Sequence, residues 1–181
     1  MPTLDDVLQN INQHCGINIE IKYPSKHCQN IGLQYFSRIE VIRIIFESIK
    51  KYQSRNIYFS SFDPYICSIL AAVQNTYPVL FLHYGTTIYE KDEEINMSFI
   101  EVLDARFGLI RAQQIGVQGM VLSKEVQCWD KDFISKVKKA GLKVFTYGTE
   151  YDDIEFVKDQ QQKGVDGIIF DLVNHDGNQG C

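Results

Sequence analysis

The chain has 181 residues, of which 45% are hydrophobic and 12% are aromatic, which is enough for one domain with a substantial core. Its net charge of −5, without a stripe of basic residues, excludes a nucleic-acid binder and a binder of anionic membranes. Five cysteines without a Cys-x-x-Cys pair argue against a disulfide framework and a zinc site. No signal peptide and no apolar run of about 20 residues are evident, so we expect a cytoplasmic protein.

The chain is predicted to open with a short amphipathic helix. Thr3 is placed to cap its first turn, and two aspartates follow near the positive end of the helix dipole. Apolar residues then recur at helical spacing, at Leu4, Val7, Leu8 and Ile11.

Residues 17–23 form the most informative predicted strand. Apolar and polar residues alternate along it, in the order Ile17-Asn18-Ile19-Glu20-Ile21-Lys22-Tyr23, before Pro24 ends the strand. Because side chains alternate across a strand, one face is apolar and the other carries Glu20 and Lys22. An antiparallel strand with a solvated polar face would show the same alternation, so this strand alone leaves its setting open.

Helical and strand patterns then alternate along the rest of the chain. After a polar loop over residues 25–37, we expect strands over 56–62, 79–84, 119–123, 143–148 and 167–171. Helices are expected before and between them: over 38–53, from 64 to about 74 with Asp63 as the cap, from Ser98 to about 115, from the cap Asp130 to 140, and over 151–163. Glycines 116, 141 and 164 are expected to end three of the helices. Residues 1–173 should form one domain, and residues 174–181 a disordered tail.

This alternation predicts a parallel sheet with right-handed crossovers. Two architectures fit the pattern, an open doubly wound sheet and a β/α barrel. No Gly-x-Gly-x-x-Gly or phosphate-binding-loop motif supports a nucleotide-binding open sheet. In a barrel, Glu20 and Lys22 would project inward near the carboxyl-terminal mouth, where paired charges indicate chemistry.

Further polar residues are expected at the same mouth because each lies at or just after the end of a strand. These residues are Ser60, Ser61, Asp63, His83, Tyr147 and Asp171. Several have simpler explanations: the serines as small fillers, Asp63 as a helix cap, and His83 as a buried histidine with its hydrogen bonds satisfied.

Six segments, taken together and in order, resemble one enzyme family. They are Pro2–Leu8, Asn18–Pro24, Phe59–Pro64, Tyr77–Leu82, Phe145–Thr149 and Gly164–Asp171. The family they resemble is that of the glycerophosphodiester phosphodiesterases, especially the eukaryotic glycerophosphocholine type. The resemblance implies an incomplete TIM (β/α) barrel of about six parallel strands that lacks the first two strands. It also implies hydrolysis of glycerophosphodiesters to glycerol 3-phosphate and an alcohol, in glycerophospholipid metabolism.

The resemblance also implies roles for individual residues. Glu20 matches a glutamate that binds a divalent cation, Ca²⁺ or Mg²⁺, and Lys22 matches the lysine that neutralises the substrate phosphate. Ser61, Phe62 and Tyr147 are expected to bind the small-molecule substrate. No catalytic residue is assigned, because the His-Arg-Gly strand and the other elements that carry the family's catalytic histidines do not occur in this sequence.

Three hypotheses follow for the function. The first is an enzyme of this family whose amino-terminal catalytic segment is missing here or supplied by another chain, so that the isolated chain has little or no activity and Glu20 and Lys22 pair with each other. The second is a non-catalytic phosphodiester-binding or regulatory barrel remnant, and the third is a nonfunctional product of a partial gene. Intact helix caps and strand patterns argue against the third. His175-Asp176 is treated as a coincidental pair, and exposed sheet edges are expected to favour self-association.

Overall fold

A computed structural model of the chain describes residues 2–24, 34–84, 104–124, 126, 130–148 and 154–169. Within these residues a single parallel sheet has the strand order β1-β2-β3-β4-β5-β6. The strands are β1 (Ile17–Glu20), β2 (Ile57–Ser61), β3 (Val79–His83), β4 (Gly119–Ser123), β5 (Lys143–Tyr147) and β6 (Gly167–Ile169). Each strand pairs with the next one in the chain, without the reversal of order that a doubly wound sheet requires. The six strands therefore form a half-barrel.

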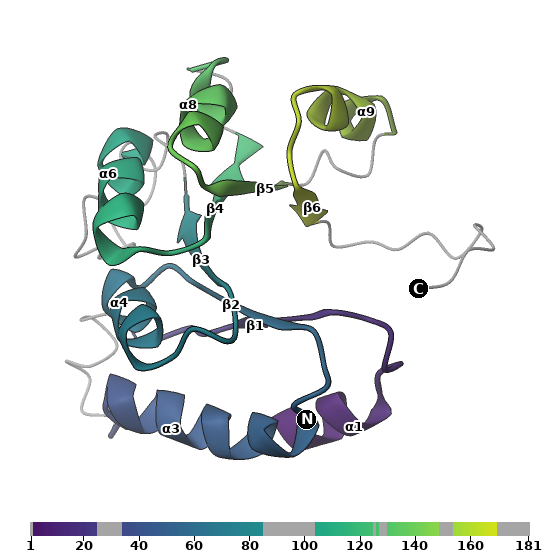
Figure 1. Ribbon diagram of the computed structural model, residues 1–181, viewed down its shortest axis with the longest axis vertical. Coiled ribbons are helices and arrows are strands. Elements are labelled where there is room, and N and C mark those ends of the chain that lie inside the picture. The colour runs from purple at the N-terminus through teal and green to yellow at the C-terminus, as the bar shows by residue number, and fades with distance from the viewer. Residues whose placement is uncertain are drawn as a thin grey trace.

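The helices cover one side of this half-barrel. Figure 1 shows them following one another around the outside of the strands, from α1 and α3 through α4 and α6 to α8 and α9. They are α1 (Leu4–Asn10), α3 (Arg38–Ile49), α4 (Pro64–Val73), α6 (Ala105–Ile115), α8 (Phe133–Lys139) and α9 (Ile154–Gln162), and the short 3₁₀ helix η1 (Lys50–Tyr52) extends α3.

Local capping chemistry explains where several helices begin and end. Thr3 and Asp6 form a reciprocal capping box at α1, which confirms the predicted cap. The Asp63 carboxylate accepts backbone N–H groups at the start of α4, as predicted. The predicted glycine ends are confirmed by φ angles of 79° at Gly116, 82° at Gly141 and 76° at Gly164.

The predicted start of the helix after residue 129 is wrong. The prediction placed Asp130 as its cap, but α8 begins at Phe133. The Asp130 carboxylate accepts the Asp132 N–H, and the Asp130 carbonyl accepts the Phe133 N–H, so Asp130 stabilises a turn that precedes the helix. The predicted helix start at Ser98 lies outside the described residues, and Asp104 caps the described part as α6.

The sheet separates two apolar clusters of unequal size. The larger lies between the sheet and the helices and is built from the odd-numbered residues of β1 to β3, such as Ile19, Phe59 and Phe81, with Met120 and Leu122 of β4. The smaller one, around Leu80, Leu82 and Val121, fills the inner face of the half-barrel. The isoleucines of residues 17–23 therefore face the helices, as the alternating sequence predicted.

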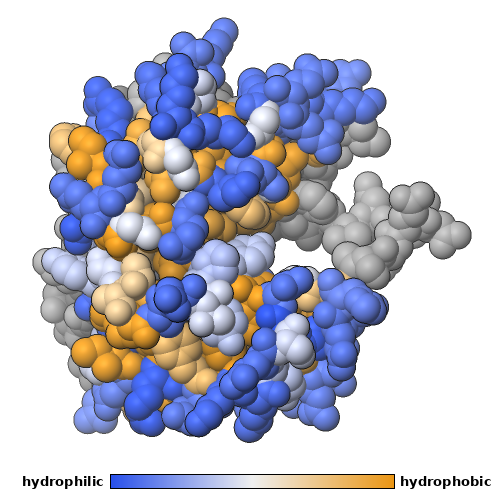
Figure 2. Space-filling view, in the orientation of Figure 1, coloured by the Kyte–Doolittle hydropathy of each residue, from blue (hydrophilic) through white to orange (hydrophobic). Residues whose placement is uncertain are grey.

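The outer surface is mainly polar. Figure 2 shows hydrophilic residues over α3 and α9, while hydrophobic residues reach the surface around α4 and α6. Among the described residues, no helix is long and apolar enough to cross a membrane. β1 and β6 are the outer strands of the described sheet, and the predicted tail over residues 174–181 and Asp171 lie outside the described residues.

Candidate functional site

Glu20 and Lys22 lie at the carboxyl-terminal end of β1. Their side chains form a loose ion pair, with 3.7 Å between the Lys22 Nζ and the Glu20 Oε1, as predicted for the chain without a bound ion. The Lys22 side chain is 81% exposed and the Glu20 side chain 33% exposed. An exposed pair at this distance contributes little to stability. Both groups are therefore able to bind a ligand without breaking a strong internal contact.

The strand ends beside this pair are held by two serines of β2. Ser60 lies on the inner face, and its hydroxyl donates to the Asn18 side chain at 2.9 Å. Ser61 is fully buried among the residues that face the helices. Its hydroxyl donates to the Ile21 carbonyl at 2.7 Å and accepts the Asp63 N–H at 3.1 Å. Ser61 thus joins the end of β1 to the turn that carries Phe62.

A second contact holds β1 against the helices. Arg38, at the start of α3, makes an ion pair of 2.7 Å with the buried Asp63 carboxylate. The Arg38 guanidinium also lies 4.1 Å from the centre of the Tyr23 ring, a cation–π contact. The Tyr23 hydroxyl donates to the Phe36 carbonyl at 3.0 Å. These contacts fix the chain directly after Lys22.

Three aromatic rings from different strands meet near the same end of the sheet. Phe62 follows β2, Tyr84 follows β3, and Tyr147 ends β5. The Phe62 and Tyr84 rings stack with centroids 3.8 Å apart, and the Tyr147 ring meets Phe62 nearly at a right angle, at 82°. The Tyr147 hydroxyl donates to the His83 carbonyl at 2.9 Å, which fixes its ring. We call Phe62, Tyr84 and Tyr147 the aromatic group.

Tyr84 also lies within the electrostatic reach of Glu20. Burial, and to a lesser extent the negative charge of Glu20, raise the pKa of the Tyr84 hydroxyl above its ordinary value. The hydroxyl is therefore neutral at physiological pH.

His83 does not belong to the inner surface. It shares the face of β3 with Val79 and Phe81 and is fully buried toward the helices. Burial lowers the pKa of its imidazole to about 4, against a smaller opposing effect of a hydrogen bond with the Asp104 backbone and of the Asp104 charge. The imidazole is thus neutral and buried on the helix side of the sheet, as the structural explanation for this histidine requires.

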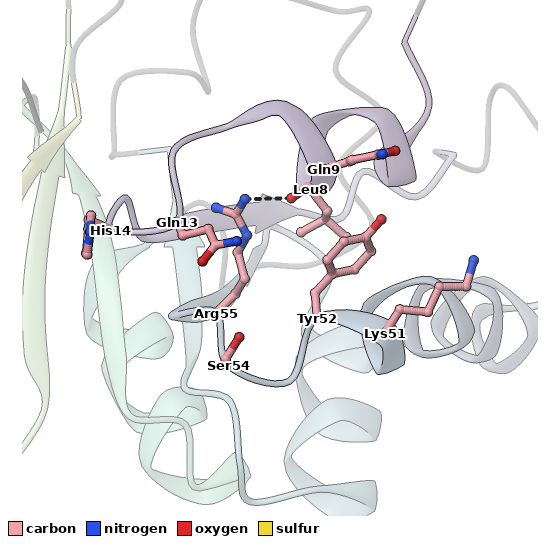
Figure 3. A pocket seen from close by; sticks show the side chains of 8 residues that line it. All are labelled: Leu8, Gln9, Gln13, His14, Lys51, Tyr52, Ser54 and Arg55. Carbon is pink, nitrogen blue, oxygen red and sulfur yellow. Dashed lines mark hydrogen bonds between the residues drawn. The ribbon is translucent and has the colours of Figure 1, made fainter.

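A hollow at the opposite end of the strands contains an arginine that is bonded to the backbone. It has a volume of about 380 Å³ and is bordered by α1, η1 and the turn before β2 (Figure 3). Its largest cationic group, Arg55, donates to the Leu8 carbonyl at 2.6 Å, to the Asn12 carbonyl at 2.8 Å and to the Ile11 carbonyl. Because this guanidinium already binds the carbonyls at the end of α1, it is poorly available to a ligand.

The described residues fit a divalent cation only in part. Ca²⁺ and Mg²⁺ take six or more oxygen ligands, and Glu20 offers one accessible carboxylate. Within the described ranges, no group of three or more His, Cys, Asp or Glu side chains could hold a metal ion. Any cation at Glu20 therefore needs further ligands from water, from substrate or from residues beyond those described.

The structure brings together four of the five residues expected from the sequence to form the site. Glu20, Lys22, Phe62 and Tyr147 lie at one end of the sheet, whereas Ser61 faces the helices behind them. Sequence reasoning missed Tyr84. Because β3 is apolar on both faces, its sequence does not show which side chains face the inside of the half-barrel. Sequence reasoning also missed Arg38, whose partner Asp63 lies 25 residues further along the chain.

The parallel half-barrel and a charged pair at its carboxyl-terminal mouth define a β/α-barrel protein with a candidate anion site. The chain belongs to the glycerophosphoryl diester phosphodiesterase family, whose model matches residues 1–175.

Named relatives come from several eukaryotes. The chain is 36% identical to a glycerophosphocholine phosphodiesterase of Schizosaccharomyces pombe, over 94% of this chain and 15% of that protein. It is 30% identical to a glycerophosphocholine phosphodiesterase of Homo sapiens, over 95% of this chain and 26% of that protein. The chain thus spans about a quarter or less of the length of these relatives.

Solved structures establish the fold. A phosphodiesterase of Oleispira antarctica, solved with the product sn-glycerol-3-phosphate, matches with a TM-score of 0.67 and 19% identity, over 93% of this chain and 57% of that one. A glycerophosphodiester phosphodiesterase of Parabacteroides distasonis matches with a TM-score of 0.63 and 18% identity, over 94% of this chain and 60% of that one.

Proposed function

We propose that this chain forms the phosphate-binding part of a metal-dependent phosphodiesterase that hydrolyses glycerophosphodiesters, such as glycerophosphocholine, to glycerol 3-phosphate and an alcohol. One observation carries the proposal. An acid and a base lie two residues apart at the carboxyl-terminal end of a barrel strand, accessible and only loosely paired. Family membership and the names of the eukaryotic relatives support the substrate class.

Each residue of the site has a role that follows from its chemistry. The Lys22 ammonium binds the phosphate as a flexible point charge. Glu20 supplies one oxygen ligand to Ca²⁺ or Mg²⁺, which when bound would polarise the phosphoryl oxygens. Phe62 and Tyr147 contact the organic part of the substrate. Ser61 acts on the substrate through the backbone that it holds, because its hydroxyl is bonded to the Ile21 carbonyl and the Asp63 N–H.

A calorimetric titration of the purified chain with sn-glycerol 3-phosphate, with and without Ca²⁺, tests this proposal. We expect Ca²⁺ to strengthen binding, and Glu20→Gln to remove that effect while leaving part of the metal-free binding. Equal titrations with and without Ca²⁺ would contradict the role of Glu20.

Binding and catalysis are separable in this chain. The described part of the inner surface carries no histidine to move protons, since His83 faces the helices. We therefore expect the chain alone to bind a phosphodiester with little hydrolysis, which is also the behaviour of the alternative, a non-catalytic phosphodiester-binding protein. Metal-dependent release of choline from glycerophosphocholine by the purified chain, abolished by Glu20→Ala, would show that the chain is catalytic by itself.

A further inference from the structure

Lys22 lies between two residues that are held in place by the rest of the protein. Before it, the Ile21 carbonyl accepts the Ser61 hydroxyl at 2.7 Å. After it, the Tyr23 hydroxyl donates to the Phe36 carbonyl at 3.0 Å. The Lys22 side chain itself is 81% exposed. The chain is therefore fixed on both sides of a lysine whose ammonium group is accessible.

The contacts of Tyr23 continue through an ion pair to the start of α4. The Arg38 guanidinium lies 4.1 Å from the centre of the Tyr23 ring, and its Nε and Nη2 both bind Oδ2 of Asp63, at 2.8 Å and 2.7 Å. The other oxygen of Asp63 accepts the Tyr65 and Ile66 N–H groups. The helix start thus fixes Asp63, which fixes Arg38, and Arg38 in turn fixes the Tyr23 ring.

Neither Arg38 nor Tyr23 is placed to bind the phosphate directly. The Tyr23 ring packs against the large apolar cluster between the sheet and the helices. The Arg38 charge is balanced by the Asp63 carboxylate, whose side chain is only 9% exposed. Any influence of these two residues on a ligand of Lys22 must therefore pass through the backbone.

The alternative explanation is that these residues only join the helices to the sheet. It accounts for the ion pair between Arg38 and Asp63, which links α3 to α4. It does not account for the engagement of both the ring and the hydroxyl of Tyr23 directly after the exposed lysine. A backbone left free at this position would lose conformational entropy when Lys22 binds a ligand.

We propose that Arg38, acting through Tyr23, positions Lys22 for the phosphate of its ligand. This inference rests on the proposed function and extends it, because it adds two positioning residues that do not touch the ligand. A backbone that is fixed before the ligand arrives sets the direction in which the Lys22 side chain leaves the strand, and it lowers the entropic cost of binding.

Calorimetric titration of the purified chain with sn-glycerol 3-phosphate measures the effect on binding. Tyr23→Leu should weaken binding about 10-fold although Lys22 itself is unchanged. Tyr23→Phe keeps the ring beside Arg38 and should recover most of the affinity. Arg38→Lys, which loses the fork of donors to Asp63, should weaken binding about 3-fold alone but have no further effect in the Tyr23→Leu background, because Arg38 acts through Tyr23.

NMR relaxation of the Lys22 backbone amide, measured without ligand, gives a readout that a general loss of stability would not move. The order parameter of this amide should be about 0.85 in the wild type and below about 0.6 in Tyr23→Leu. Tyr23→Phe should lie close to the wild type.

Tyr52→Leu is the matched control. Tyr52 is a partly buried tyrosine that packs against the same cluster, and its hydroxyl donates to the Asp5 carbonyl at 3.5 Å, at the opposite end of the strands. This variant should keep both the affinity and the Lys22 order parameter of the wild type. Wild-type values of either quantity in Tyr23→Leu, or equal losses in Tyr52→Leu, would overturn the inference alone. A wild type that does not bind sn-glycerol 3-phosphate would overturn the proposed function and this inference with it.

Discussion

At the amino-terminal ends of the strands, Arg55 and Asp166 are bonded to the backbone, whereas at the carboxyl-terminal end of β1 the Glu20–Lys22 pair is accessible. Arg55 is 8% exposed and binds three carbonyl groups. Asp166, before β6, accepts the Val144 N–H at 2.9 Å and two lysine ammonium groups. The Lys22 ammonium has one described partner, at 3.7 Å.

This difference separates stability from function within one sheet. Arg55 and Asp166 satisfy backbone groups that would otherwise lack these hydrogen bonds, so their removal should lower the free energy of unfolding. The Glu20 and Lys22 charges satisfy little of the protein itself, so their removal should mainly affect ligand binding. Four sets of substitutions test this comparison, in order of decreasing effect on stability.

The largest loss is expected for Arg55→Ala. It leaves the carbonyls at the end of α1 without their donors, and should lower the free energy of unfolding by about 3 kcal/mol. Urea denaturation followed by circular dichroism measures the loss. Arg55→Lys keeps the charge but has fewer hydrogen-bond donors, so its free energy of unfolding should lie between those of the wild type and Arg55→Ala. An Arg55→Ala variant as stable as the wild type would break the comparison.

Asp63→Ala is expected to have the next largest effect. Asp63 caps α4 and pairs with Arg38, so its removal should lower the free energy of unfolding by about 2 kcal/mol, measured in the same way. Asp63→Asn retains an oxygen for the cap and should recover part of this loss. If the two variants were equally unstable, the ion pair rather than the cap would carry the effect.

Asp166 should make stability depend on pH. Burial raises the pKa of its carboxyl, but the Val144 N–H and the Lys143 and Lys138 ammonium groups outweigh burial and hold the pKa below its ordinary value. Its stabilising effect is therefore complete above about pH 4 and is lost as the pH falls through the lower, folded-state pKa.

Asp166→Asn should remove the part of the stability that depends on the Asp166 charge and is lost in acid. Its urea midpoint at pH 7 should be lower than that of the wild type, by less than for Arg55→Ala, and the gap should narrow as the pH approaches about 3. A gap that stays constant with pH would mean that the Asp166 charge does not stabilise the fold.

The smallest effects on stability are expected for Glu20→Gln and Lys22→Met. Each should change the free energy of unfolding by less than about 0.5 kcal/mol, because the pair is exposed. Thermal melts of the two variants and the wild type should nearly coincide. A loss comparable with that of Asp63→Ala would place the pair among the structural charges.

The sequence predicted the fold well because its signals are local. Alternating strand and helix patterns, the Asp63-Pro64 start and glycines before strands each reflect a few neighbouring residues. The same locality explains the error at Asp130, since an aspartate that stabilises a turn looks like one that caps a helix until the next residues are placed.

The site could be predicted only where strand alternation is visible. Glu20 and Lys22 interrupt an apolar pattern and could be assigned to the inner face. His83 and Tyr84 are adjacent at the end of an apolar strand, and the sequence favoured the histidine, whereas the structure buries it toward the helices and stacks Tyr84 on Phe62. Contacts between distant segments, such as Arg38 with Asp63, have no local signal at all.

The most direct test of the central claim compares two lysines at opposite ends of the strands. Lys22 pairs with Glu20 at 3.7 Å and Lys51 pairs with Asp5 at 3.5 Å, and both ammonium groups are largely exposed. Calorimetric titration with sn-glycerol 3-phosphate should show binding to the wild type and to Lys51→Met, and at least 10-fold weaker binding to Lys22→Met. Equal binding by the two variants would contradict the claim that the carboxyl-terminal end of β1 holds the phosphate.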